Sequence, residues 1–162
     1  MLACLVQDDA VMAGARKPED FAAWQLAWEL KGRIVAFTSI PPALHDRKFC
    51  EEIMESARSG PDNICEGYYR FSPPDFANFV RMARGSLGEV RNQLTHAKSK
   101  KYLSDDEFSE LIHLCERAIR AATGLRLYLL SCPKNFDPRK PKPEPGTKER
   151  ATKEARTKEP GT

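Results

Sequence analysis

The sequence predicts an all-α protein, an antiparallel up-down four-helix bundle with a disordered C-terminal tail. Three observations predict this fold class. Apolar residues recur at three- and four-residue spacing through four long segments, no segment alternates as a strand would, and short connections rich in proline or serine separate the segments. Long helices that are joined by short connections pack as antiparallel neighbours, which is the arrangement of an up-down bundle.

The first two expected helices cover residues 19–39 and 44–70. Pro18 and the acidic residues that follow it suit a helix start, because proline fits the first turn and carboxylates stabilise the positive end of the helix. The I-P-P sequence at residues 40–42 ends the first helix, since proline cannot continue it. The F-S-P-P sequence at residues 71–74 ends the second helix for the same reason.

The third and fourth expected helices cover residues 73–100 and 104–131. Ser72 is a candidate N-cap of the third helix, which ends in a basic run that suits a helix C-terminus. Ser104 and Glu107 have the spacing of a capping box at the start of the fourth helix. The apolar stripe of this helix is the most regular in the chain, with Phe108, Leu111, Ile112, Cys115, Ala118, Ile119, Ala122, Leu125 and Leu129.

The three expected regions are a flexible leader at residues 1–17, the bundle at residues 18–132 and a disordered tail at residues 133–162. The tail is rich in proline and repeats the sequence T-K-E three times, and it has almost no apolar side chains to bury. The net charge of +3 arises in this tail, because residues 20–132 carry 15 basic and 15 acidic side chains. A neutral bundle argues against a strongly basic nucleic-acid-binding domain.

Composition and motif spacing argue against several classes of function. The five cysteines form no C-x-x-C pair, which is typical of reduced thiols in a cytoplasmic protein, and no apolar run approaches the roughly 20 residues of a membrane span. The three histidines are far apart, and no Glu-x-x-His sequence of a di-iron bundle is present. Because no nucleophile and base have a recognisable spacing, we expect no enzyme activity, no cofactor and no metal site.

The most informative segment is S-G-P-D-N-I-C-E-G-Y-Y-R at residues 59–70, inside the second expected helix. Glycine costs about 1 kcal/mol and proline about 3 kcal/mol in a helix interior, so a requirement of packing, assembly or binding is indicated. In the third helix, the sequence R-M-A-R-G-S-L-G-E at residues 81–89 follows no strand and lacks the Lys-Ser/Thr of a phosphate loop. Its small residues are better explained by the close approach of another helix.

The polar and small residues of these two segments are predicted to form a structural motif between the second and third helices. We expect Glu89 to be buried there, with Arg58, Asn63 or Arg70 as candidate partners, because a lone buried carboxylate is costly. A neighbouring subunit is a further candidate partner. The members of the motif are Asn63, Glu66, Gly67, Arg70, Gly85, Ser86 and Glu89.

A second set of residues could bind nucleic acid. Aromatic side chains at the end of the second helix are candidates for base stacking, and arginines and lysines of the third helix are candidates for phosphate contacts. The alternative for the aromatic residues is a place in the core or an interface. The candidates are Tyr68, Tyr69, Arg70, Arg81, Arg84, Lys98, Lys100 and Lys101.

Taken together, these residues resemble the bacterial four helix bundle protein family, also called the 23S rRNA intervening-sequence protein family. Two motifs in the same order carry the resemblance. The first, S-x-P-x-N-I-x-E-G-x-x-R, is present at residues 59–70, and the second, F-x-x-F-[LV]-x-x-A-x-G-S-L-x-E, is present at residues 76–89. The aromatic first helix and the Y-L-S sequence at residues 102–104 also fit, so that the resemblance covers about residues 20–131.

The resemblance implies an antiparallel four-helix bundle that assembles as a homopentamer. Some members of the family are encoded inside insertions in 23S rRNA genes, and a related branch is the accessory protein of diversity-generating retroelements, which partners a reverse transcriptase and nucleic acid. The family offers no established catalytic residues to carry over. The proline-rich T-K-E tail is a departure from the family pattern.

Two hypotheses of function follow. The first is a non-enzymatic, homo-oligomeric bundle that binds RNA, DNA or a nucleoprotein partner such as a reverse transcriptase, in which assembly multiplies a weak positive surface. The alternative is a structural or adaptor module that contacts proteins and binds no nucleic acid. The neutral charge of the bundle and its small residues favour this alternative.

Overall fold

The computed structural model describes residues 15–70 and 72–133. Most of the expected leader, at residues 1–14, and of the expected tail, at residues 134–162, lies outside the described residues.

Four long α-helices and two short 3-10 helices make up the described chain, which contains no strand. The all-α fold class and the four-helix architecture are therefore confirmed. The elements in order are η1 (Pro18–Asp20), α2 (Ala22–Thr38), η2 (Ala43–His45), α3 (Arg47–Tyr69), α4 (Pro73–Ser99) and α5 (Asp105–Ser131).

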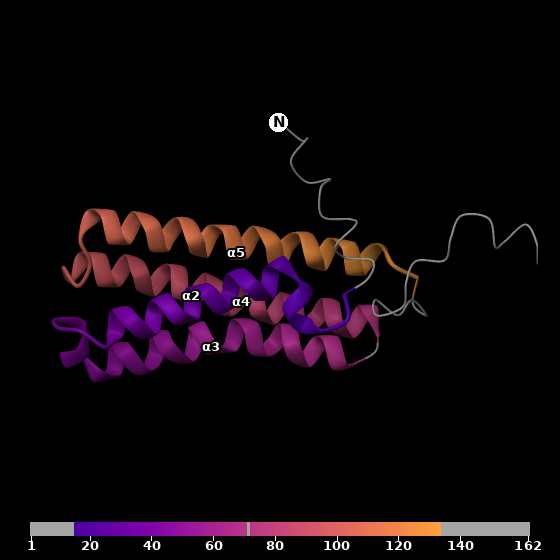
Figure 1. Cartoon of the computed structure of the whole chain (residues 1–162), viewed down its shortest axis with the longest axis horizontal. Helices are drawn as coiled ribbons and strands as arrows, with labels where there is room; N and C mark the ends of the chain where they lie inside the picture. The colour runs from indigo at the N-terminus through magenta and orange to yellow at the C-terminus, as the bar shows by residue number, and fades with distance from the viewer. Residues whose placement is uncertain (1–14, 71, 134–162) are drawn as a thin grey trace, which may run out of the picture.

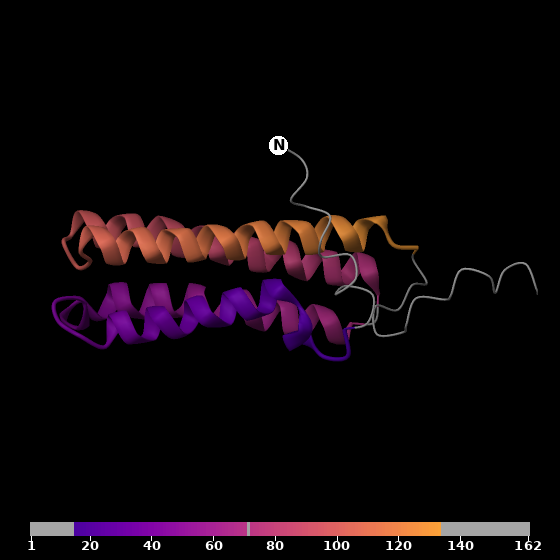
Figure 2. The ribbon, with the colours of Figure 1, turned by 45° about the horizontal axis from the view of Figure 1, so that its top comes forward.

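The four helices form a bundle in which each long helix packs against two others. α2 lies against α3 and α5, and α4 also lies against α3 and α5, so that α2 and α4 occupy opposite corners. Successive helices are joined at alternating ends of the bundle (Figure 1). Figure 2 shows the same bundle turned, with α2 and α3 as one helix pair and α4 and α5 as the other.

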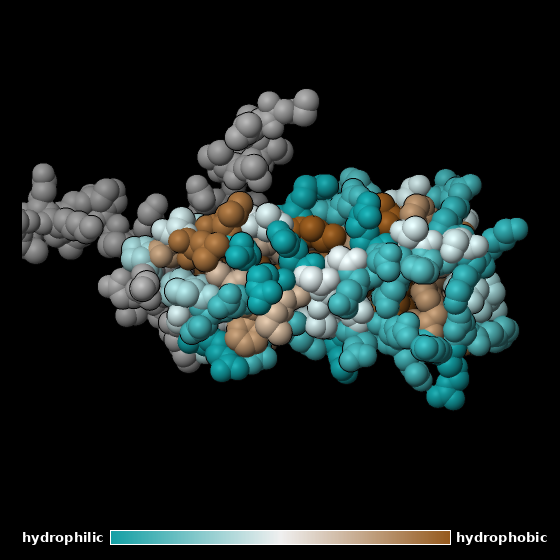
Figure 3. All heavy atoms as spheres, turned by 180° about the vertical axis from the view of Figure 1, so that it is seen from behind, coloured by the Kyte–Doolittle hydropathy of each residue, from teal (hydrophilic) through white to brown (hydrophobic). Residues whose placement is uncertain are grey.

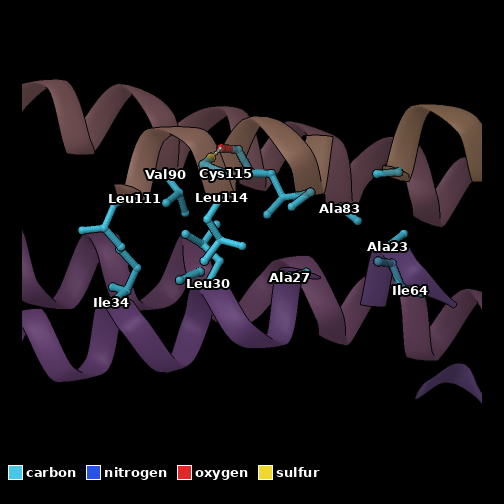
Figure 4. Packing of buried hydrophobic residues seen from close by; sticks show 14 of the residues in the cluster. Ala23, Ala27, Leu30, Ile34, Ile64, Ala83, Val90, Leu111, Leu114 and Cys115 are labelled. Carbon is cyan, nitrogen blue, oxygen red and sulfur yellow. Dashed lines mark hydrogen bonds between the residues drawn. The ribbon is translucent and has the colours of Figure 1, made fainter. Parts of the chain in front are cut away.

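The core fills the space between these two helix pairs. Figure 4 shows Leu111 and Leu114 of α5 pointing toward Leu30 and Ile34 of α2, while the Cys115 thiol is turned toward α4. All five side chains are buried, and the Cys115 thiol donates a hydrogen bond to the backbone carbonyl of Leu87 at 3.3 Å. Because every long helix contributes one apolar stripe, burial of these stripes is the main force that holds the bundle together.

The helix ends match the expected capping signals only in part. The Ser104–Glu107 capping box is present at the start of α5. Asp46 caps α3, since its side chain accepts a hydrogen bond from the backbone N–H of Phe49, and this cap explains why the helix begins at Arg47 rather than at residue 44. Ser72 occupies the N-cap position of α4, as expected, but its side chain makes no capping hydrogen bond.

An aromatic cluster closes the end of the bundle where α2 begins and α3 ends. Phe21, Tyr68 and Phe76 meet edge to face, with ring centroids 5.5 to 6.3 Å apart. The Tyr68 hydroxyl donates a hydrogen bond to the backbone carbonyl of Ala15, which is 1% exposed. Ala15 is therefore packed against the bundle, which corrects the expectation that the flexible leader extends through residue 17.

The two glycines of the first motif allow close helix contacts. A Cβ atom on Gly67 would lie 2.5 Å from Phe76 Cδ2 and 2.7 Å from Phe79 Cβ, so only glycine fits there. A Cβ atom on Gly60 would lie 3.3 Å from Leu87 Cδ2, which is a tighter contact than usual. α3 continues through Pro61, which is buried. These contacts give a packing reason for glycine in this helix.

Candidate functional site

Four polar residues of the two motifs lie, with two further polar residues, on one outer surface of the bundle, between α3 and α4. We call this surface the α3–α4 face and define it by three residues of each helix. The side chains range from buried Ser56 to exposed Glu89. The six residues are Ser56, Ser59, Asn63, Ser86, Glu89 and Gln93.

A short chain of hydrogen bonds crosses from α3 to α4 on this face. The Asn63 amide donates to the Ser59 hydroxyl at 2.9 Å and to the Ser59 carbonyl at 2.8 Å. The Ser59 and Ser86 hydroxyls are 2.8 Å apart, and the Ser56 hydroxyl lies 3.2 Å from a Glu89 carboxylate oxygen, to which it donates. These contacts fix the register of the two helices.

The same face is hollowed into an open groove of about 460 Å³. Glu52, Glu55 and Glu89 line the groove together with the three serines of the face, and no cation lines it. The side-chain oxygen of Gln93, which also lines the groove, is buried without a hydrogen-bond partner among the described residues. The groove is therefore polar and acidic, with hydrogen-bonding capacity that contacts within the described chain leave unused.

Several expectations for the polar motif need correction. Glu89 is exposed, and its partner is Ser56 rather than Arg58, Asn63 or Arg70, so the expected burial is wrong for this chain. Glu66 does not reach α4 but pairs with Arg70 one turn along its own helix.

Gly85 does not serve close packing within the described chain. A Cβ atom there would meet nothing within 4 Å, and the residue is exposed. The close approach of another helix that the second motif predicts is therefore not made at Gly85 by any described helix of this chain.

The arginines of α4 lie on its other side, next to α5. Arg91 donates hydrogen bonds to the Glu116 carboxylate of α5, at 3.3 and 3.4 Å. Arg84 precedes Arg91 by seven residues and Arg81 precedes Arg84 by three, so the three side chains share this side of the helix. Arg120 of α5 lies 4.0 Å from Glu116.

We call this second surface the α4–α5 face and define it by Arg81, Arg84, Arg91, Glu116 and Arg120. Neither Arg81 nor Arg84 forms an ion pair with any described residue, so the face is positively charged. Figure 3, which views the bundle from behind, shows a largely hydrophilic surface with separate apolar patches.

The aromatic and basic candidates for nucleic-acid binding do not meet in one patch. Tyr68 is 3% exposed and its hydroxyl is engaged, so it offers no ring face for a base. Tyr69 is 57% exposed, and Arg70 pairs with Glu66 and lies over the Phe79 ring. Arg70 is thus engaged at the end of α3, whereas the α4 arginines face α5.

The three lysine candidates lie at the opposite end of α4. Lys98 pairs with Asp105, and Lys100 pairs with Asp46 at 2.7 Å. The Lys100 ammonium, the Phe49 backbone N–H and the Tyr102 hydroxyl all bond to Asp46, and these contacts lower its pKa from 3.8 to about 2. Lys101 forms no ion pair among the described residues, so one of the three lysines keeps an uncompensated charge.

No group of three or more His, Cys, Asp or Glu residues within the described chain could hold a metal ion. The four described cysteines are free thiols, and burial raises the pKa of Cys115 to about 11, which makes it unreactive. None of the helices in residues 15–70 and 72–133 is long and apolar enough to cross a membrane.

Sequence reasoning missed Ser56, Ser59 and Gln93 as parts of the α3–α4 face, and it missed Arg120 on the α4–α5 face. Ser59 was part of the first motif, and its spacing of four residues from Asn63 was the available signal. Nothing in the sequence singles out Gln93. Its place in the groove depends on which side of α4 faces α3.

The fold and these two polar faces define a helical-bundle protein in which some motif residues pack the core and others lie on the outer surface. The family model of the 23S rRNA-intervening sequence protein matches residues 19–124. The chain therefore belongs to this family, and the resemblance that its motifs indicated is confirmed. No curated protein matches the chain.

Proposed function

We propose that this chain is a non-enzymatic assembly protein that works as a homo-oligomer and contacts its partners through the outer faces of the bundle. The observation that carries the proposal is the α3–α4 face. There, the motif residues Ser59, Ser86 and Glu89 line an open groove together with further carboxylates and with a side-chain oxygen that has no hydrogen-bond partner among the described residues, that of Gln93. Core packing alone does not require such groups, whereas an interface between chains would use them.

This face supports the second hypothesis from the sequence, a module that contacts proteins, over direct binding of nucleic acid by the bundle. Of the candidate nucleic-acid residues, Tyr68 is buried, while Arg70, Lys98 and Lys100 are held in ion pairs. A homopentamer, which the family resemblance implies, is the assembly that we propose.

The test is the mass of the full chain in solution, measured by native mass spectrometry and by light scattering over a hundredfold range of concentration. We expect a discrete oligomer that dissociates on dilution. A chain that stays monomeric at every concentration would overturn the proposal.

Binding of RNA or DNA, or of a nucleoprotein partner such as a reverse transcriptase, is the second candidate function. One observation favours it: residues 133–162 carry nine basic and five acidic side chains, and an oligomer would bring several such tails together. The test is binding of structured RNA and duplex DNA as a function of salt, with a variant that ends at Pro133 as the control. We expect affinity that falls steeply with salt and is lost in the control. No binding by the full chain at low salt would contradict this candidate.

A further inference from the structure

We propose that the acidic α3–α4 face of one copy binds the arginine-rich α4–α5 face of a second copy, in a head-to-tail contact that closes into a ring. This inference rests on the proposed homo-oligomer and specifies which surfaces meet.

The first argument is charge complementarity. Glu55 and Glu89 line the groove of the α3–α4 face and form no ion pair with any described residue. Arg81 and Arg84 on the α4–α5 face are equally without ion pairs in the described chain. Two surfaces of opposite charge on one molecule attract each other between copies, and arginine is enriched in protein interfaces.

The two partners cannot neutralise each other within one chain. Glu89 follows Arg84 by five residues on α4, which places the two side chains on different sides of the helix. The hydrogen bond from Ser56 holds the Glu89 side chain toward α3. The hydrogen bond from Arg91 to α5 shows that the side of α4 shared by Arg91 and Arg84 faces α5. Their charges can therefore meet only across a contact between two copies.

The second argument is the angle between the two faces. They share α4, which packs against both α3 and α5, so they are adjacent sides of the bundle (Figures 1 and 2). Adjacent sides of a four-helix bundle point outward roughly at right angles. A contact between two different faces generates a closed ring when its rotation permits, and this angle permits rings of roughly four or five copies.

The third argument is the relative height of the charges along the bundle. In a closed ring the copies are not displaced along the axis, so groups that meet must lie at similar heights. The five residues from Arg84 to Glu89 correspond to about 7.5 Å of helix rise, which the length of an arginine side chain spans.

The ring also gives the exposed glycine of the second motif a role. α4 is the shared corner of the two faces, so its outer edge is turned toward the ring axis. Gly85 lies on this edge, where a Cβ atom would meet nothing within 4 Å. A small residue there lets the α4 helices of several copies approach one another.

The experiment is a charge reversal measured by native mass spectrometry and light scattering. Glu89→Arg and Arg84→Glu are made singly and together, in the full chain. Both residues are exposed, so the fold should persist, and circular dichroism verifies this.

Arg117→Glu is the matched control. Arg117 is exposed and follows Glu110 by seven residues, so the two side chains lie on the same side of α5. Because Glu110 pairs with Arg33 of α2, this side faces α2 and not α4.

We expect each single reversal to weaken assembly by about tenfold or more in dissociation constant, and the double reversal to restore much of it. The control should assemble like the unchanged chain. If neither single reversal changes the dissociation constant of the oligomer, or if the double variant assembles no better than the single variants, the pairing of the two faces is overturned. The proposed homo-oligomer would remain in place. A symmetric dimer would overturn the ring, and a chain that never assembles would overturn the proposed function itself.

Discussion

Gly67 on α3 and Gly85 on α4 come from the two motifs that identify the family, yet their surroundings differ completely. A Cβ atom on Gly67 would overlap Phe76 and Phe79, whereas a Cβ atom on Gly85 would meet nothing within 4 Å. The first glycine is needed for the packing of the chain on itself. Gly85 is not needed for this packing. The reason for a glycine at this position must therefore lie outside the single chain or in the evolutionary history of the sequence. A small residue in a helix therefore does not by itself indicate a contact between helices.

The largest effect should come from Gly67→Ala. The added methyl group would be 2.5 Å from Phe76 Cδ2, and the aromatic cluster at this end of the bundle would have to shift. We expect the free energy of unfolding to fall by about 1–3 kcal/mol, as overpacking of a core typically does. Denaturant unfolding of the full chain measures this change, and an unchanged or increased stability would contradict the close packing.

Gly85→Ala should act in the opposite direction. Alanine favours the helix over glycine and meets no neighbour here, so the free energy of unfolding should rise by about 0.5–1 kcal/mol. The measurement uses protein diluted below the concentration at which it assembles. Gly88→Ala, at another glycine of α4 with open surroundings, is the control and should behave alike. A loss of stability at Gly85 alone would show a contact within the chain.

Asp46 and Glu89 provide a comparison of two carboxylates at the bundle surface. Asp46 joins the start of α3 to the turn between α4 and α5, by hydrogen bonds to Lys100 and Tyr102. Because its folded pKa of about 2 is below the ordinary 3.8, its contribution to stability is present above pH 3.8 and is lost as the pH falls toward 2.

The measurement is the stability of the unchanged chain and of Asp46→Asn across this range of pH. We expect the difference between the two proteins to shrink as the pH falls from above 3.8 to about 2. A difference that stays constant with pH would mean that the charge of Asp46 does not contribute to folding.

Glu89→Ala should have the smallest effect on folding. Its carboxylate is exposed and accepts one hydrogen bond, from Ser56, so the free energy of unfolding of the dissociated chain should change by no more than about 0.5 kcal/mol. Thermal or denaturant unfolding at low protein concentration measures this. A loss of several kcal/mol would revive the expectation of a buried network around Glu89.

The fold was largely predictable because its signals are local. The capping box at Ser104 and the apolar stripe of α5 are readable from spacing alone, and the structure bears both out. The expectation for Glu66 failed for a physical reason: Arg70 lies four residues away on the same helix, and a nearby partner is easier to reach than one on another helix.

The candidate site was predictable only in part. The two motifs marked Ser86 and Glu89, but the groove also depends on Glu52, Glu55 and Gln93, which carry no motif signal. The nucleic-acid candidates were grouped because they are close in sequence or on one helix. The structure separates them: Tyr68 of α3 is in the core, whereas the spacing of Arg81 and Arg84 places them on the side of α4 where Arg91 contacts α5.

The sequence by itself determined that this protein is a four-helix bundle of its family, because helix periodicity, caps and motifs are encoded by neighbours along the chain. Only the tertiary structure decided which motif residues are buried and which are exposed. That outcome depends on how each helix is rotated about its axis when all four apolar stripes are buried at once. The rotation of α4 places Glu89 on an acidic face and Arg84 on a basic one, and this separation of charge is the basis for the proposed assembly.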